Sequence, residues 1–170
     1  SLSELNKLIR SLNLAIYSPI KYVLPSKVME YSRKYDTNTG KSIFKQIDRE
    51  QSLVQLMRIN ILKRMESSIY SFGITVSKIL QNIDIALKKL DNFENIEEDF
   101  DIEELDIDDT RLDSVMIGSK KIKVLLQDID QIRWRTELEG DKAILERVLK
   151  EAFKITIGRD QKLKELKDLI

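Results

Sequence analysis

Three cations in this chain have the type and the position to do chemistry. Arg58, Lys63 and Arg64 fall within Leu53–Met65, the most apolar stretch of the sequence. A charge in such a stretch must reach solvent, an acidic side chain or a phosphate. One interpretation is contact with nucleic-acid phosphates, and the other is pairing within the fold, for instance with the acidic run at 91–113. We name these three residues as candidate contacts to nucleic acid or to a neighbouring lobe.

The acidic run at 91–113 holds 12 Asp and Glu against a single Arg. Asp99, Asp101 and Glu103 have the spacing of a calcium-binding loop, but Glu104 stands where that loop requires glycine. A di-iron carboxylate site would need Glu-x-x-His pairs, and the chain has no His. We predict no metal site here. We interpret the run as a mobile, solvated loop, with a tether or an autoinhibitory decoy covering the basic half of the chain as the alternatives.

Catalytic chemistry is not expected in this chain. Zero His and zero Cys remove the commonest general base and the thiolate nucleophile. Thr39-Gly40-Lys41-Ser42 is similar to the end of a phosphate loop, but the first glycine would fall at Tyr35 and no strand precedes it, so we interpret it as coincidence. Glu137, Glu139 and Asp141 are close carboxylates, two of them loop and cap residues in our interpretation. We therefore predict no catalytic, cofactor-binding or metal-binding residue.

The net charge of zero conceals an uneven distribution. Residues 1–90 carry 15 Lys and Arg against 7 Asp and Glu, residues 91–113 have a balance of −11, and residues 114–170 have a balance of +3. The positive part suits a polyanionic partner. No membrane-length apolar run and no signal peptide is visible, and the absence of Cys favours a reducing compartment, so we expect a cytoplasmic protein without membrane partners. Because the sequence begins at Ser1 without Met, we expect a piece of a longer chain.

The candidate cations are positioned by a long helix predicted over residues 41–90. Its sequence lacks proline, and its one glycine in 42–90, Gly73, marks a break, a close helix contact or a tolerated residue. Apolar residues recur at helical spacing. They include Phe44, Ile47, Val54, Ile61, Met65, Ile69, Phe72, Val76, Ile79, Ile83, Leu87 and Leu90. As one rod it would be roughly 75 Å long at about 1.5 Å per residue, so other helices must lie along it.

Those other helices are predicted from apolar spacing and from boundary residues. Their ranges are 2–16, 25–35, 120–138, 141–155 and 159–170. Asp141 is expected to cap the fourth helix and Gly158 to break it, and the first part of 120–138 is compatible with a loop or strand. Trp134 is interpreted as a core anchor. We predict an all-α fold: one domain over 1–170, an elongated antiparallel bundle or hairpin built around the long helix.

Several stretches carry a resemblance to a known family. They are Arg49–Leu53, Leu56–Phe72 with its Glu66-Ser67-Ser68, Lys121–Lys123, Asp128–Asp130, Trp134, Leu138-Glu139, Asp141 and Ile155–Leu166. They resemble the inter-lobe helical region of bacterial superfamily II helicases of the Swi/Snf type, where an Arg- and Leu-rich helix followed by Glu-Ser-Ser lies between two RecA-like lobes. The sequence departs from the family pattern at Gly158, where proline or another residue often precedes Arg-Asp.

The resemblance implies a non-catalytic helical insertion domain of an ATP-dependent DNA helicase or translocase. It implies that residues 159–170 start the helix leading into the second lobe, and that the domain transmits lobe movement and contacts nucleic acid. Its partners would be the RecA-like lobes of the same chain and DNA. ATP and Mg would be bound by the parent protein, an ATP hydrolase, and not by this fragment. The alternative is a stand-alone helical interaction or scaffold module with no motor activity.

Overall fold

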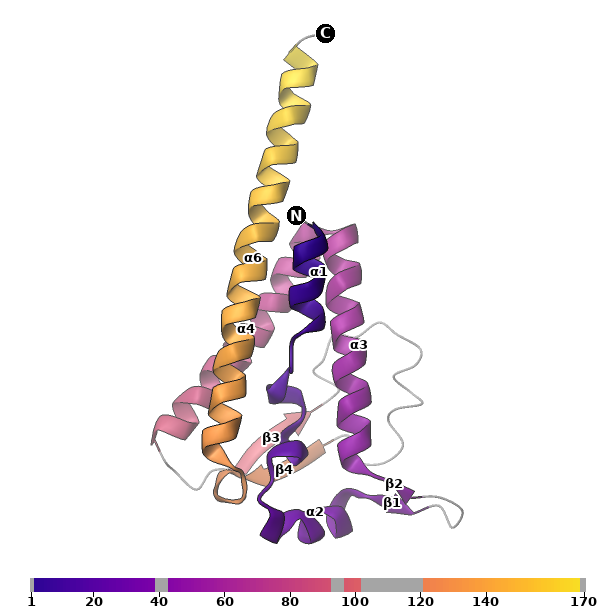
Figure 1. The fold of residues 1–170 in the computed structure, drawn as a ribbon, viewed down its shortest axis with the longest axis vertical. Coiled ribbons are helices and arrows are strands. Elements are labelled where there is room, and N and C mark those ends of the chain that lie inside the picture. Colours follow the sequence, from indigo (N-terminus) through magenta and orange to yellow (C-terminus); the bar gives the residue numbers. More distant parts are fainter. Residues whose placement is uncertain (1, 39–42, 93–96, 102–120, 169–170) are drawn as a thin grey trace.

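The computed structural model describes residues 2–38, 43–92, 97–101 and 121–168, and the fold is an all-α bundle, as predicted (Figure 1). The α-helices are α1 (Leu2–Arg10), α2 (Val28–Tyr35), α3 (Gln46–Ser67), α4 (Ile69–Asn92) and α6 (Gln131–Asp168). Short 3-10 turns cover Ala15–Tyr17, Pro19–Tyr22, Pro25–Lys27 and Leu126–Asp128. The strands are β1 (Thr37–Asn38), β2 (Ile43–Phe44), β3 (Glu97–Asp101) and β4 (Lys121–Leu125), in two antiparallel pairs, β1 with β2 and β3 with β4.

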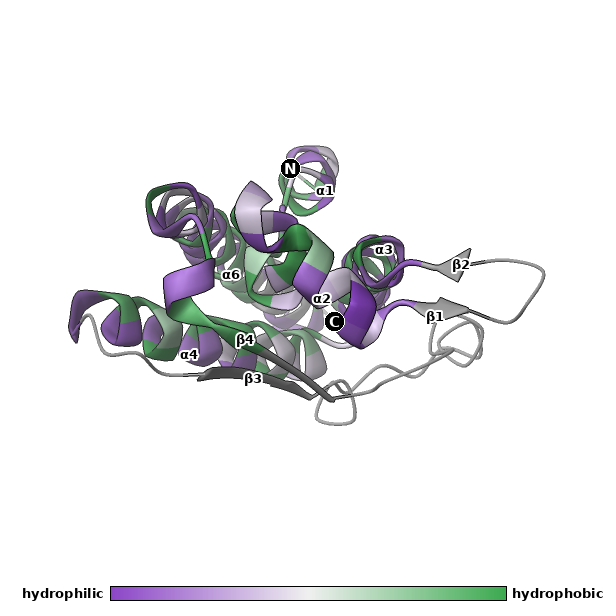
Figure 2. Cartoon of the chain, turned by 90° about the horizontal axis from the view of Figure 1, so that it is seen from below, coloured by the Kyte–Doolittle hydropathy of each residue, from purple (hydrophilic) through white to green (hydrophobic). Residues whose placement is uncertain are grey.

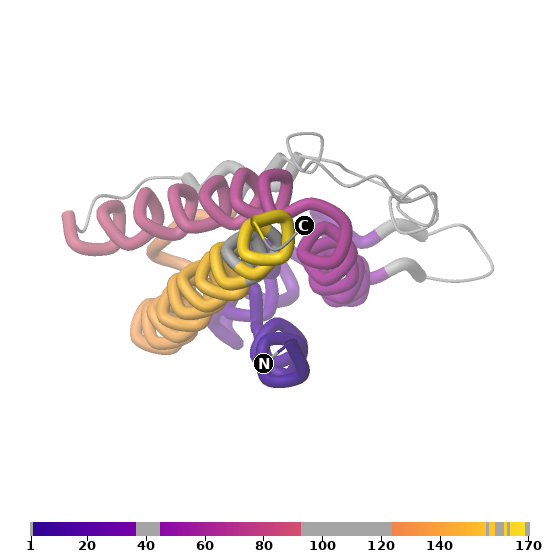
Figure 3. Tube along the Cα trace, turned by 90° about the horizontal axis from the view of Figure 1, so that it is seen from above, coloured from indigo at the N-terminus to yellow at the C-terminus, as the bar shows by residue number. Residues whose placement is uncertain are grey.

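The core lies between α1, α3, α4 and α6. Seen from above, α6 lies between α4 and α1 and contacts both (Figure 3). Figure 2, seen from below, shows hydrophobic segments (green) on the helix ribbons that surround the middle of the bundle. The largest fully buried side chains include Ile9, Leu53, Ile61, Phe72, Ile79, Ile83 and Trp134. A single core therefore joins both ends of the sequence.

The long helix predicted over 41–90 is wrong as one continuous element. The chain is extended at Ser68 (φ −157°, ψ 109°), and this residue separates α3 from α4. The hydroxyl of Ser68 accepts a hydrogen bond from the Ser71 amide at 3.2 Å, which helps to begin α4. The break lets the apolar faces of α3 and α4 pack against each other, whereas one straight helix would keep them apart. Gly73 is not the break: it lies inside α4, where a Cβ would be at an ordinary contact distance of 3.5 Å from Cζ of Phe153, so Gly73 touches α6 at a place where alanine would also fit.

The first predicted helix, 2–16, also ends early. It stops at Arg10, and Leu14 then adopts a left-handed backbone conformation (φ 48°, ψ 49°) before the 3-10 turns. We call residues 11–24 the link. Although the link has only short 3-10 turns, most of its large side chains are buried, with Leu12 and Leu14 at 0% exposure. It therefore forms part of the core and is not a surface connection.

The three helices predicted at 120–138, 141–155 and 159–170 are instead the strand β4 followed by one 38-residue helix, α6. The cap at the start of α6 is Asp130, whose carboxylate accepts from the Arg133 amide at 3.3 Å. Gly158 does not break the helix, and neither it nor Gly140 has a described heavy atom within 4 Å of where a Cβ would stand. A helical glycine costs only about 1 kcal/mol relative to alanine, which a helix of this length tolerates.

The acidic run predicted as a mobile loop over 91–113 is only partly described. Asp91 belongs to α4 and pairs with Arg135 of α6 at 2.7 Å. Residues 97–101 form β3, whose antiparallel register sets Asp99 opposite Lys123 on β4. Residues 93–96 and 102–120, which include most of the predicted loop, lie outside the described residues.

Candidate functional site

Arg58 makes its hydrogen bond within the fold. The side chain lies half-buried on α3, and its Nε donates a hydrogen bond to the carbonyl of Leu12 at 2.7 Å. Burial lowers the pKa of the guanidinium, and the negative charge of Asp141 opposes that shift. Arg58 therefore fixes the link against α3.

Arg64 joins the two long helices. Its Nη1 donates to the hydroxyl of Thr75 on α4 at 2.8 Å, and its Nε donates to Oδ1 of Asn60 at 3.4 Å. Lys63 is exposed on α3. The structure thus places Arg58, Lys63 and Arg64 on one helix but not on one face, since neighbouring positions turn by about 100°. Of the three, Lys63 is the one whose charge is directed to solvent.

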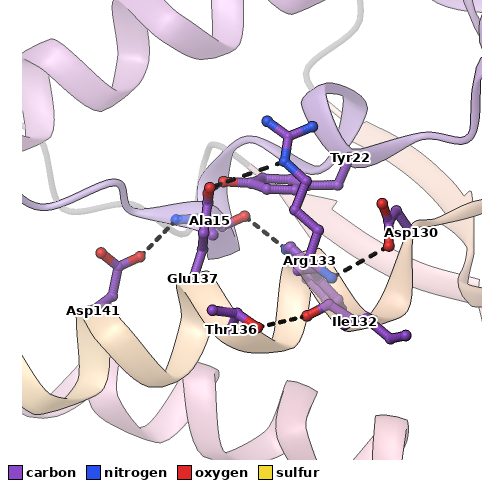
Figure 4. A network of polar contacts seen from close by, with 9 residues as sticks. Ala15, Tyr22, Asp130, Ile132, Arg133, Thr136, Glu137 and Asp141 are labelled. Carbon is purple, nitrogen blue, oxygen red and sulfur yellow. Dashed lines mark hydrogen bonds and ion pairs between the residues drawn. The ribbon is translucent and has the colours of Figure 1, made fainter.

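A network of polar contacts joins the N-terminal part of α6, which we call its root, to the link (Figure 4). The carboxylate of Asp141 accepts backbone hydrogen bonds from Asn13 at 2.8 Å and from Ala15 at 2.9 Å, on either side of Leu14. Backbone amides around a residue of positive φ converge into a concavity that binds anions. Burial raises the pKa of Asp141, while these amide hydrogen bonds act in the opposite direction. Asp141, predicted as a helix cap, is instead a buried anchor for the link.

Three more residues of α6 contact the same link. The indole Nε1 of Trp134 donates to the carbonyl of Ala15 at 3.0 Å, and Trp134 has no exposed surface, so its interpretation as a core anchor is confirmed. The hydroxyl of Tyr22 donates a short hydrogen bond to the carboxylate of Glu137. The Arg133 guanidinium lies 5.0 Å from the centre of the Tyr22 ring (Figure 4). We call Trp134, Glu137 and Asp141 the root residues.

The segment before α6 is tied to the link and to α2. The Leu24 amide donates to the carbonyl of Asp128 at 2.7 Å, and the Asp130 amide donates to the carbonyl of Tyr22 at 2.8 Å. The hydroxyl of Tyr31 on α2 donates to the carboxylate of Asp128 at 2.6 Å. Burial and this hydrogen bond raise the pKa of Tyr31. Hydrogen bonds therefore hold both the link and α2 to the segment that leads into α6.

Glu50 is a buried carboxyl that sequence reasoning missed. Its Oε1 accepts from the Ile20 amide at 3.4 Å, and its Oε2 is buried without a hydrogen-bond partner among the described residues. Burial raises the pKa of Glu50 well above its usual range. The neighbouring Arg49 is engaged by the carbonyl of Tyr35 at 2.6 Å. The signal was the position of Glu50, three residues after Ile47 and four before Val54 on the apolar stripe.

The contacts of the root residues hold α6 to the link. In the described part of the chain, no group of three or more acidic side chains is placed to hold a metal ion. The phosphate-loop-like residues 39–42 lie outside the described residues, and the pairs on either side form the hairpin β1–β2, where a phosphate loop needs a strand and then a helix. Among the helices described, none is both long enough and apolar enough to span a membrane.

Comparisons of this chain with protein-family models, with curated proteins and with solved structures found no match.

Proposed function

We propose that this chain is the non-catalytic helical domain between the two RecA-like lobes of an ATP-dependent DNA helicase or translocase of the Swi/Snf type. The observation that carries the proposal is the difference between the two ends of α6, one anchored and one projecting. Its root residues are held to the link by buried polar contacts, and its last turns extend well beyond α1 and α3 (Figure 1). A helix fixed at one end and projecting at the other is suited to transmit a displacement.

Movement of the projecting end would carry the link and α1 with it. The lobes would bind ATP and Mg and hydrolyse the nucleotide, while this domain would supply stiffness and a contact surface. Lys63 remains the candidate for DNA phosphate contact, because Arg58 and Arg64 already have partners in the fold. A DNA motor of this bacterial type would act in the cytoplasm.

The test is the reading frame that encodes these residues, followed by an assay of the full protein. RecA-like motifs on both sides of the domain, with DNA-stimulated ATP hydrolysis in the full chain, would support the proposal. A frame without nucleotide-hydrolysing lobes would overturn it and leave the stand-alone interaction module. ATP hydrolysis by the isolated 170 residues would contradict the non-catalytic role.

A further inference from the structure

A patch of exposed apolar side chains lies where α6 leaves the bundle. Tyr70 and Ile74 of α4 are 75% and 40% exposed, and Phe153 and Ile157 of α6 are 44% and 56% exposed. The two helices touch here, because the Phe153 ring packs over Gly73. We call Tyr70, Ile74, Phe153 and Ile157 the seam patch.

The four side chains of the seam patch face the same side of the bundle. α4 and α6 run in opposite directions (Figure 1). At about 100° per residue, Tyr70 and Ile74 lie on the flank of α4 turned away from the buried Phe72, and Ile157 lies on the flank of α6 turned away from the buried Ala152. Because antiparallel helices that share a buried side also share an outer side, the two flanks form one surface.

The border of the seam patch is mainly basic. Exposed Lys78 follows Ile74 by one turn of α4, while exposed Lys150 and Lys154 lie beside Phe153 on α6. Among the described side chains of α6, the acids on this side are Glu146 and Glu151, the latter 3.8 Å from Lys154 in an exposed pair on the same helix. Such a pair is weak and leaves the lysine available to another carboxylate.

We propose that the seam patch is a docking surface for an acidic amphipathic helix of a partner protein. The apolar face of that helix would cover the four side chains, and its carboxylates would meet Lys78, Lys150 and Lys154. A second copy of this chain is a poorer occupant, because two-fold pairing of the patch would bring lysines of both copies together. The inference does not depend on the proposed motor, since every residue belongs to the bundle itself.

The test uses two labelled synthetic helices with the same leucine face, one with glutamate and one with lysine on its polar edges. Fluorescence anisotropy is expected to show binding of the glutamate peptide, with the lysine peptide weaker by about tenfold or more. Ile157→Gln and Ile74→Gln should each weaken binding of the glutamate peptide several-fold. Ile132→Gln, an exposed isoleucine near the root of the same helix, should leave it unchanged.

Circular dichroism of each variant establishes that it is folded before binding is compared. Equal binding of the two peptides, no binding of the glutamate peptide, or equal effects of Ile157→Gln and Ile132→Gln would overturn the proposal. Self-association that Ile157→Gln abolishes would favour a second copy and would also overturn it. If the reading frame encodes no motor lobes, the proposed function is wrong, but binding of the glutamate peptide would still support the docking surface. The two proposals can therefore be tested independently.

Discussion

Trp134 and Ala15 are 119 residues apart in the sequence, yet the Trp134 indole donates to the Ala15 carbonyl at 3.0 Å in the centre of the core. Both residues have no exposed surface. The hydrogen bond sets the position of α6 along the link, and the other root contacts are arranged around it. The bundle is therefore closed by its most distant segments.

Trp134→Phe keeps an aromatic ring in the core but removes the donor. The Ala15 carbonyl would be left buried without a partner, so we expect the free energy of unfolding to fall by about 1–3 kcal/mol. Chemical denaturation followed by circular dichroism measures the change. The control is Tyr70→Phe at an exposed ring, where the free energy should move by less than about 0.5 kcal/mol. Equal effects of the two substitutions would contradict the structural role of the indole.

Glu50 makes stability depend on pH. Its pKa in the folded chain is raised well above 4.5, so above pH 4.5 the native state binds more protons at this site than the unfolded state. The free energy of unfolding should therefore fall as the pH rises from about 4.5 through the folded pKa of Glu50. Glu50→Gln keeps the shape without the charge, and should flatten that slope and raise stability at neutral pH by about 1 kcal/mol or more.

Urea titrations of both proteins between about pH 5 and pH 8 measure this difference. Asp141 contributes a slope of the same sign, because its pKa is also raised by burial, and that contribution should persist in Glu50→Gln. An unchanged slope in the variant would show that Glu50 is ionised in the folded protein.

Gly158→Ala tests the continuity of α6. In a continuous helix with open space around this position, alanine should stabilise by about 1 kcal/mol. If the helix instead ended there in a left-handed conformation, alanine would destabilise. The melting temperature and the helical circular dichroism signal distinguish the two outcomes, and Gly140→Ala, in the same helix and equally unobstructed, provides the matched comparison.

Arg58 and Lys63 should separate stability from binding. Arg58→Ala removes a charged donor from the Leu12 carbonyl and should cost about 1.5–3 kcal/mol of stability. Lys63→Ala should leave stability nearly unchanged. If the full protein binds DNA through this helix, Lys63→Ala should lower affinity for all sequences alike and reduce the salt slope by about 1. Unchanged DNA binding and an unchanged salt slope would remove Lys63 from the interface.

The helical class and the burial of Trp134 were predictable, because the first follows from apolar spacing and the second from residue size. The break at Ser68 was not, since two apolar stripes meet only when the chain folds back. The role of Asp141 was not predictable either. Aspartate is a common helix cap, but here its carboxylate accepts from the amides on either side of Leu14. The left-handed backbone of Leu14 that brings these amides together has no signal in the sequence. The strand at 97–101 was not predictable, because four of its five residues are acidic and the alternation of apolar and polar residues that is typical of a strand is missing.

The anatomy of α6 also has a kinetic consequence. Trp134, Leu138, Leu145 and Val148 are fully buried, whereas Ile157 and Leu166 are more than half exposed on the same helix. Backbone amides near the root can exchange with deuterium only when the bundle opens globally, while those near the far end need only local fraying. One unbroken helix would then carry a gradient of exchange lifetimes.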